Sequence, residues 1–451
     1  MATPVTPDEW LPILTKRLDA GRPRIDLLRS YTNGNAPLPE GGKSLRAAWS
    51  AFQKKARTNL GELIIEAVAE RIICNALMVA GSSQDDDEAR RIWVENRMPT
   101  ALGDTVRDML TTGVGYMVVG RSPEGRPVVT SEKPEFMYAA TDPLRPHVSR
   151  AAVKVWRDVD AGMDYAFVWV PGSRQMYERP MRNRRKQILT QTEGSWVKVG
   201  EPELFIGAPP VVVFQNHSDT GEFESHVDII DRINKDTLDR LVTVAMQAFR
   251  QRYLEGGLPK TDVDGNPIDY AAIFTPAPGA LWDLPDGITL KETQESAQSI
   301  MAMLSAEKDD FRNLAAVTRT PLAMLVPEGQ NQSAAGSEFA KEGLITKSKD
   351  RIERIKPAGS EVITRAMRIV REDFDQTVEL GFADPTFVTY SEKHDANVKA
   401  KSGDVPWRTR MIDILGYSAD RVDAMQTELE EERLAAAAFI PVPPEVPTNV
   451  V

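Results

Sequence analysis

The sequence has little of the chemistry on which most enzymes and metal proteins depend. Its 451 residues include one cysteine and four histidines. One cysteine cannot form an internal disulfide or a thiolate metal site, and the scattered histidines lack the His-Glu-x-x-His spacing of a zinc site. No Gly-x-x-x-x-Gly-Lys-Ser/Thr stretch is present, so a P-loop is excluded. The sequence therefore predicts no catalytic residue, no metal and no cofactor.

Long apolar runs are absent as well. No stretch approaches the roughly 20 apolar residues that a membrane helix needs, and the first residues lack the basic start and apolar centre of a secretory signal. We therefore expect no membrane contact and synthesis in a cytoplasm, which agrees with a single unpaired Cys74. The remaining composition, 41% hydrophobic and 27% charged, is that of a globular protein, and the length indicates about two to four packing units.

The balance of charge is acidic, with a formal net charge of -11 at pH 7. A protein that grips DNA through its phosphates normally presents a basic patch, so this balance argues against tight wrapping of nucleic acid. It leaves open a channel through which DNA slides, because a ring of acidic subunits repels phosphates and keeps DNA from sticking.

The pattern of apolar residues changes twice along the chain. Up to residue 112 apolar positions recur at helical spacing, from 113 to 216 short alternating runs predict a β-rich layer of hairpins, and helical spacing then returns. The expected helices of the first part are 9–20, 24–31, 60–78, 88–96 and 102–110. The expected strands are 113–120, 126–131, 151–158, 165–171, 175–180, 186–192, 195–200 and 210–216. The later helices are 223–252, 296–318 and 333–374, followed by the last helices within about 395–438.

Two long helical segments bracket an insertion rich in Pro and Gly at 256–287. About 28 helical residues extend roughly 40 Å, so we expect an antiparallel helix pair with a small module at its tip. A loop at 320–332 follows the second of these helices. The next helix should kink before Pro357, because proline lacks an amide proton and disfavours a helical residue before it.

Four local features invite a chemical interpretation, but each has a simpler structural one. Gly113 and Gly115 start like a dinucleotide fingerprint, yet the third glycine is missing and a strand follows, which favours a helix-to-strand turn. Asp85 to Asp87 are expected to form a solvated acidic loop beside a helix N-terminus rather than a cation site. Cys74 is expected to be a buried structural thiol. For the basic stretch 179–186 we favour a solvated hairpin or an intersubunit salt-bridge surface over a nucleic-acid contact.

Several short stretches resemble, in their order, segments of the portal proteins of tailed phages with long non-contractile tails. The most specific runs from Thr320-Pro321-Leu322 to Gln330-Asn331-Gln332-Ser333-Ala334 and resembles the tract around the family's tunnel loop. Gly336 departs from the family, which usually has a helix-favouring residue there. The other matching stretches are Tyr31-Thr32-Asn33-Gly34 with Leu38-Pro39, Asn59 ahead of 68–73, Ile92-Trp93 with Asn96, and residues 112–116, 209–216 and 228–235.

The resemblance, over about residues 1–430, implies an α+β, mainly helical portal fold with a β-rich wing, a long-helix stem pair, a clip insertion, a tunnel loop and a helical crown. The implied parts are the N-terminal helical part of the wing 1–112, the β-rich wing 113–220, the first stem helix 221–252, the clip 253–295, the second stem helix 296–318, the tunnel loop 319–332, a long kinked helix returning to the wing 333–390, the crown 391–440 and a flexible tail 441–451.

The resemblance also implies a function and partners. The chain would be a non-enzymatic subunit of a ring of twelve copies at the capsid vertex, the channel for DNA packaging and ejection. Its partners would be double-stranded DNA bound non-specifically, the terminase large subunit, the head–tail adaptor, scaffold and major capsid protein. It would reside in the virion after assembly in the host cytoplasm.

The resemblance to portal proteins also implies which residues have functional roles. Gln330, Asn331 and Gln332 would face DNA in the channel as neutral hydrogen-bonding groups, which touch phosphates weakly. Stem packing would rest on apolar residues of the two long helices, namely Ile230, Ile233, Leu241, Met303 and Leu314. Two alternatives remain open: another phage head–tail structural protein, and an uncharacterised hydrolase with a β-rich catalytic domain.

Overall fold

The structure is a computed structural model, and it describes residues 4–39, 47–81, 86–181, 194–248, 252–255, 260–261, 264–265, 267–268, 289–292, 297–326, 334–386, 390–417 and 419–438. The chain divides into two compact units. The first comprises Met1–Ala36, Asn59–Val227 and Ala315–Val451, and the second Pro37–Thr58 and Asp228–Leu314. The fold is mixed helix and sheet, as the α+β prediction states.

The first unit begins with one long helix, α1 (Pro7–Thr32), where two short helices were expected. A capping box between Thr6 and Glu9 starts it, and Pro7 occupies its first turn, where no amide proton is needed. Pro12 and Pro23 lie within the helix on its exposed side, where water can reach the carbonyls that lose their partners. Burial of a continuous apolar stripe overrides these breaking signals; the buried residues include Leu14, Leu18, Ile25 and Leu28.

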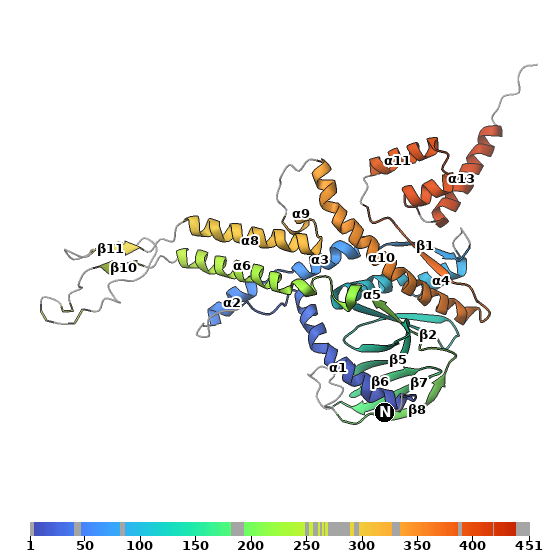
Figure 1. Cartoon of the computed structure of the whole chain (residues 1–451), viewed down its shortest axis with the longest axis horizontal. Coiled ribbons are helices and arrows are strands. Elements are labelled where there is room, and N and C mark those ends of the chain that lie inside the picture. Colours follow the sequence, from blue (N-terminus) through green and yellow to red (C-terminus); the bar gives the residue numbers. More distant parts are fainter. Residues whose placement is uncertain are drawn as a thin grey trace, which may run out of the picture. The chain divides into compact units, whose positions relative to one another are not determined.

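A five-stranded antiparallel sheet packs against α1 (Figure 1). Its order is β4 (Met137–Asp142), β5 (Arg145–Asp158), β6 (Met163–Val170), β7 (Ser173–Pro180) and β8 (Val197–Leu204). The predicted hairpin between β5 and β6 is confirmed, with Val155 opposite Ala166. Successive side chains alternate between the sheet faces: Val153, Val155 and Val168 join the α1 core, whereas Ala152 and Trp169 belong to a core on the other face.

That other face packs against a three-stranded sheet of β3 (Pro127–Glu132), β2 (Val114–Arg121) and β9 (Val211–Gln215). Tyr116 and Val211 face the five-stranded sheet, while Met117, Val212 and Phe214 are buried on the opposite side. There α5 (Met98–Thr112) and α10 (Ala334–Val370) contact the strands. The first unit therefore stacks α1, two sheets and a helical layer.

The segment predicted as one helix over 60–78 is two elements, so that prediction is wrong in its second half. Helix α3 (Leu60–Ala69) ends early, and β1 (Cys74–Val79) pairs antiparallel with β12 (Val378–Phe382), a strand that the sequence did not reveal. Leu77 is buried in this pair opposite Leu380. A short apolar run fits helix and strand periodicity equally, and only its distant partner decides.

Helix α10 continues through Pro357 as one element, and the kink expected there stays a prediction. Pro357 and Glu353, whose carbonyl loses its partner, are both exposed to water. Short helix α4 (Asp87–Glu95) also packs on α10. The C-terminal part contains α11 (Tyr390–Ser402), the short helix α12 (Trp407–Thr409), the π-helical turn η3 (Arg410–Ile414) and α13 (Ala419–Ala438).

The second unit contains α2 (Ala47–Lys55), α6 (Val227–Ala248) from Asp228 onward, and most of α8 (Ala297–Thr318). Strands β10 (Arg252–Glu255) and β11 (Thr289–Glu292), which directly follow α6 and precede α8, pair antiparallel at the far end of the two helices (Figure 1). Within the insertion, a bridge between Thr261 and Pro267 closes the expected turn around Gly265. The rest of the insertion, strand 186–192 and the tail 441–451 lie outside the described residues.

Candidate functional site

Helices α6 and α8 run antiparallel within the second unit and are joined by charged side chains. Arg232 donates to Asp310 (Nη2–Oδ1 2.5 Å), and Glu307 accepts from Thr237 (3.0 Å) and Arg240 (3.1 Å). Acidic groups crowd this face: burial, Asp310 and other carboxylates raise the pKa of Asp236. These bonds fix the register of the two helices.

The apolar residues predicted to pack between these helices are buried at one end of the pair and become more exposed toward the other end. Ile230, Ile233 and Leu314 are fully buried, whereas Leu241 and Met303 are only half-buried. Toward the end of the pair that carries β10 and β11, the side chains of Val244 and Met301 are 49% and 67% exposed. Gln330, Asn331 and Gln332 lie outside the described residues, as does the loop from 327 to 333.

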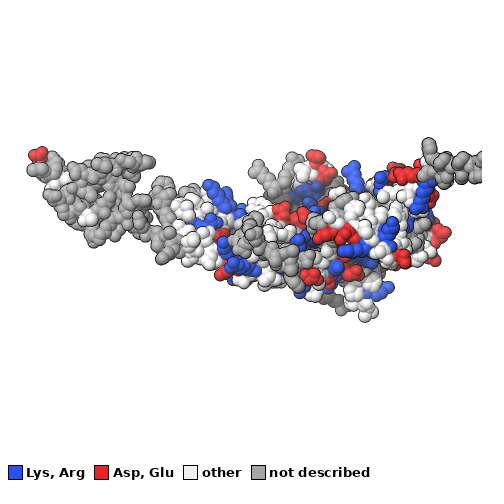
Figure 2. Space-filling model, turned by 90° about the horizontal axis from the view of Figure 1, so that it is seen from above, with Lys and Arg blue, Asp and Glu red and all other residues white. Residues whose placement is uncertain are grey.

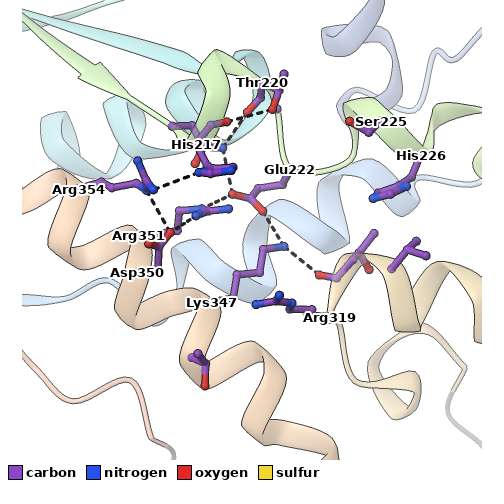
Figure 3. A pocket seen from close by; sticks show the side chains of 15 residues that line it. His217, Thr220, Glu222, Ser225, His226, Arg319, Lys347, Asp350, Arg351 and Arg354 are labelled. Atoms are coloured by element: carbon purple, nitrogen blue, oxygen red, sulfur yellow. Dashed lines mark hydrogen bonds and ion pairs between the residues drawn. The ribbon is translucent and has the colours of Figure 1, made fainter. Parts of the chain in front are cut away.

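A second polar site was not anticipated: a pocket of about 490 Å³ in the first unit, where the chain enters α6, leaves α8 and passes along α10. Its lining residues come from the segment after β9, from the end of α8 and from one face of α10 (Figure 3). Chain segments about a hundred residues apart therefore meet here, at the beginning of one long helix and the end of the other.

Glu222 is the centre of this pocket, with only 3% of its side chain exposed. Lys347 donates to it (Nζ–Oε2 2.7 Å), as do Arg351 (Nε–Oε1 2.6 Å) and Asn216 (Nδ2–Oε1 3.0 Å). Lys347 also donates to the carbonyl of Thr318 (2.9 Å), the last residue of α8. One lysine on α10 thus holds the approach to α6 and the end of α8 together.

The charges of this network are unequal. Burial alone would raise the pKa of the Glu222 carboxyl, but the Lys347 and Arg351 cations outweigh it and hold this pKa below its ordinary value. Burial lowers the pKa of the Lys347 ammonium, and the nearby Arg351 and Arg319 cations add to this despite the pull of Glu222. Burial and Lys347 likewise lower the pKa of His226. The pocket is therefore rich in positive charge.

Further cations line the pocket on α10. Asp350 pairs with Arg351 and with Arg354 (Nε–Oδ2 3.1 Å), and Arg354 also lies 3.1 Å from Nδ1 of His217. Figure 3 shows His217, Arg354 and Asp350 on one side of Glu222, with Lys347 and Arg319 on the other. The structure brings His217 and His226 into one pocket, although the sequence had suggested only scattered histidines.

The segment that carries Glu222 is held by close packing. Gly221 has no room for a side chain, since a Cβ would lie 2.1 Å from the carbonyl oxygen of Thr111. Arg24 of α1 donates to the carbonyls of Thr112 and Asp219, each at 3.0 Å. Phe223, next to Glu222, is fully buried. Contacts with α1 and α5 thus fix the segment that carries the Glu222 carboxylate.

For most of the local stretches that allowed both a chemical and a structural interpretation, the structure decides between the two. Gly113 ends α5 in the left-handed region (φ 89°), which confirms the helix-to-strand turn. Asp86 caps α4 by accepting from the amide of Ala89, as expected of an acidic helix start. Cys74 is half-buried rather than fully buried as expected, and burial raises its pKa to about 12. Among the described residues no three His, Cys, Asp or Glu side chains gather in a way that could hold a metal ion.

The expectation for the basic stretch is wrong for Arg179, which is fully buried rather than on a solvated surface. It bonds Asp164 (3.3 Å) and stacks on the ring of Trp196 (4.4 Å). Arg157 bonds the same carboxylate (2.6 Å). The buried Asp164 carboxylate thus compensates the charge of the buried Arg179 guanidinium. The other basic residues of the stretch, Arg182 onward, lie outside the described residues.

Sequence reasoning missed Glu222, Lys347 and Arg351. The spacing of Lys347 and Arg351 places both on one helix face, the only local signal present. Nothing near Glu222 in the chain indicates that its partners lie more than a hundred residues away. No helix in the described part of the chain combines the length and apolarity needed to cross a membrane.

Comparisons with known proteins identify the family. One solved structure similar to the chain, "Neck of empty GTA particle computed with C6 symmetry", has 12% sequence identity and a TM-score of 0.44 over 86% of this chain and 97% of that chain, too weak a likeness to carry an argument. A search of curated proteins finds no match. The model of the family described as "Phage portal protein, SPP1 Gp6-like" matches residues 13–436. The chain therefore belongs to this family of phage portal proteins.

Proposed function

We propose that the chain forms a closed ring of twelve copies at the capsid vertex and that double-stranded DNA passes through its channel during packaging and ejection. The observation that carries this proposal is the antiparallel pair α6 and α8, which leaves apolar Val244 and Met301 exposed. Exposed apolar side chains on a helix pair of about 33 Å are stabilised when a neighbouring copy covers them.

The parts of the chain take the following roles in this proposal. Residues 1–220 form the wing, with helices in 1–112 and strands from 113. The stem consists of 221–252 and 296–318, and its packing rests on the five apolar residues named above. The clip is 253–295, the tunnel loop 319–332, the return to the wing 333–390, the crown 391–440 and the tail 441–451.

Electrostatics agree with a channel in which DNA slides. The described part of α6 carries four aspartates against three cations, and α8 carries three acidic residues against two cations. Figure 2 shows acidic and basic side chains intermixed on the face in view rather than a basic surface. Contacts with phosphates would thus be weak and independent of DNA sequence.

Partners and chemistry follow from the same proposal. The clip would receive the terminase large subunit and later the head–tail adaptor, while scaffold and major capsid protein would surround the ring during assembly in the host cytoplasm. ATP hydrolysis would belong to the terminase, since the chain has no P-loop. We propose no catalytic role for any residue.

Deletion of Gln330 to Gln332 tests the role of the loop. We expect rings of normal mass, measured by native mass determination, but defective filling or retention of DNA in packaging assays. Replacement of the three residues by Ser-Gly-Ser keeps the loop length and controls for shortening. Normal packaging by the deletion variant would refute the loop's role, and a chain that stays monomeric would refute the ring.

A further inference from the structure

Arg319 occupies a backbone position that normally belongs to glycine. Helix α8 ends with the amide of Thr320 bonded to the carbonyl of Ala315 (3.0 Å) and the amide of Arg319 bonded to that of Ala316 (3.4 Å). In this helix ending the residue after the cap adopts the left-handed region, where glycine is favoured because a Cβ is strained. Arg319 adopts it with φ 54°. Strained backbone of this kind is concentrated at functional sites.

The side chain of Arg319 lines the pocket around Glu222. Four cations line this pocket, Arg319, Lys347, Arg351 and Arg354, against the two carboxylates of Glu222 and Asp350. Lys347, Arg351 and Arg354 are engaged by those carboxylates. Within the part of the chain that the structure describes, the Arg319 guanidinium has no hydrogen-bond or ion-pair partner.

We propose that this pocket binds a phosphate group, held by the guanidinium of Arg319 and the ammonium of Lys347 with Ser225 and His226 beside it. The planar fork of arginine matches a phosphate with two parallel hydrogen bonds, and an ammonium adds a point charge. His226 directly precedes α6, whose N-terminus favours an anion. The volume of about 490 Å³ accommodates a sugar-phosphate as well as a free ion.

The electrostatics of the pocket support this assignment. Lys347 and His226 have lowered pKa values, first because they are buried and then because neighbouring cations repel their charged forms. A phosphate would relieve this repulsion. The bonds from Lys347 and Arg351 compensate the charge of the Glu222 carboxylate within the pocket.

Calorimetric titration of the full-length protein with inorganic phosphate tests the site, with sodium chloride at equal ionic strength as the reference. We expect saturable binding that Arg319→Gly weakens at least tenfold. Glycine suits the left-handed backbone, so this variant should fold at least as well as the wild type. Arg319→Asn, also compatible with that backbone, provides a second variant, and Arg91→Gln on the exposed face of α4 is the matched control that should bind normally.

A short DNA duplex in the same titration distinguishes the sources of the phosphate. If the duplex competes with inorganic phosphate and loses affinity in Arg319→Gly, the ligand is the nucleic-acid backbone. If phosphate binds through Arg319 and the duplex does not compete, the ligand is a free phosphate or nucleotide. Absence of saturable phosphate binding, or equal binding by wild type and both Arg319 variants, overturns the proposal.

Discussion

Replacing Glu222 by glutamine removes one negative charge and changes little else in size. The side chains of Glu222 and Lys347 are 3% and 7% exposed, so neither can turn to water. The change removes the carboxylate that compensates the buried Lys347 ammonium, whereas Arg351 keeps its ion pair with Asp350. Glutamine can still accept one hydrogen bond, so the loss comes mainly from charge.

The size of the effect follows from burial. Removing one partner of a buried ion pair costs about 3–5 kcal/mol, because the remaining charge is stranded. Lys347→Met should cost less, about 1–3 kcal/mol, since Arg351 and Asn216 still donate to Glu222 and the Thr318 carbonyl loses one donor. The double variant should be less destabilised than the sum of the two by about 0.5–3 kcal/mol.

Urea denaturation at one fixed protein concentration measures these differences, because assembly would otherwise shift the apparent stability. The expected order of midpoints is wild type, then Lys347→Met, then Glu222→Gln. Asp309→Asn, on the exposed surface of α8, is the control for loss of a carboxylate and should move the midpoint little. Equal midpoints for Glu222→Gln and Asp309→Asn, or simple additivity in the double variant, would refute the buried network.

Three further predictions concern pH, thiol reactivity and glycine. The pKa of the Glu222 carboxyl is lower in the folded than in the unfolded protein. Its stabilisation is therefore complete above the unfolded pKa of about 4.3 and is lost as the pH falls through the folded pKa. The difference in urea midpoint between wild type and Glu222→Gln should accordingly shrink only below about pH 4.3. Burial raises the pKa of Cys74 from 9.0 to about 12, so iodoacetamide at pH 8 should alkylate it about a thousandfold more slowly than in urea, and a folded rate within tenfold would contradict this. In α10, Gly343→Ala should stabilise by about 0.5–1 kcal/mol, whereas Gly359→Ala, whose Cβ would lie 2.7 Å from Leu380, should destabilise by about 1–3 kcal/mol in the same urea assay.

Much of the fold could be read from local patterns. The β5 and β6 hairpin follows from alternating apolar residues on both sides of a turn, and the two long helices follow from sustained helical spacing. Gly113 and Asp86 were interpretable because caps and turns depend on a few neighbouring residues. Local signals sufficed wherever the stabilising contacts are themselves local.

Features that depend on contacts between distant parts of the chain could not be predicted from the sequence. Strand β1 is a strand because β12 lies beside it, about three hundred residues later. Helix α1 continues through Pro23 because its apolar residues are buried against a sheet whose strands lie much later in the sequence. The Glu222 pocket joins three separate segments, and Arg179 became an interior residue only because Asp164 is buried beside it. No pattern in the sequence around these residues records such partners.

Cryo-electron microscopy of the purified, assembled protein tests most directly whether α6 and α8 enclose a pore. We expect closed rings of twelve subunits in which the two helices line a central channel wide enough for duplex DNA, with Val244 and Met301 covered by the neighbouring subunit. A reconstruction in which these helices point away from the ring axis, or in which Val244 and Met301 stay exposed to solvent, would contradict the proposed function.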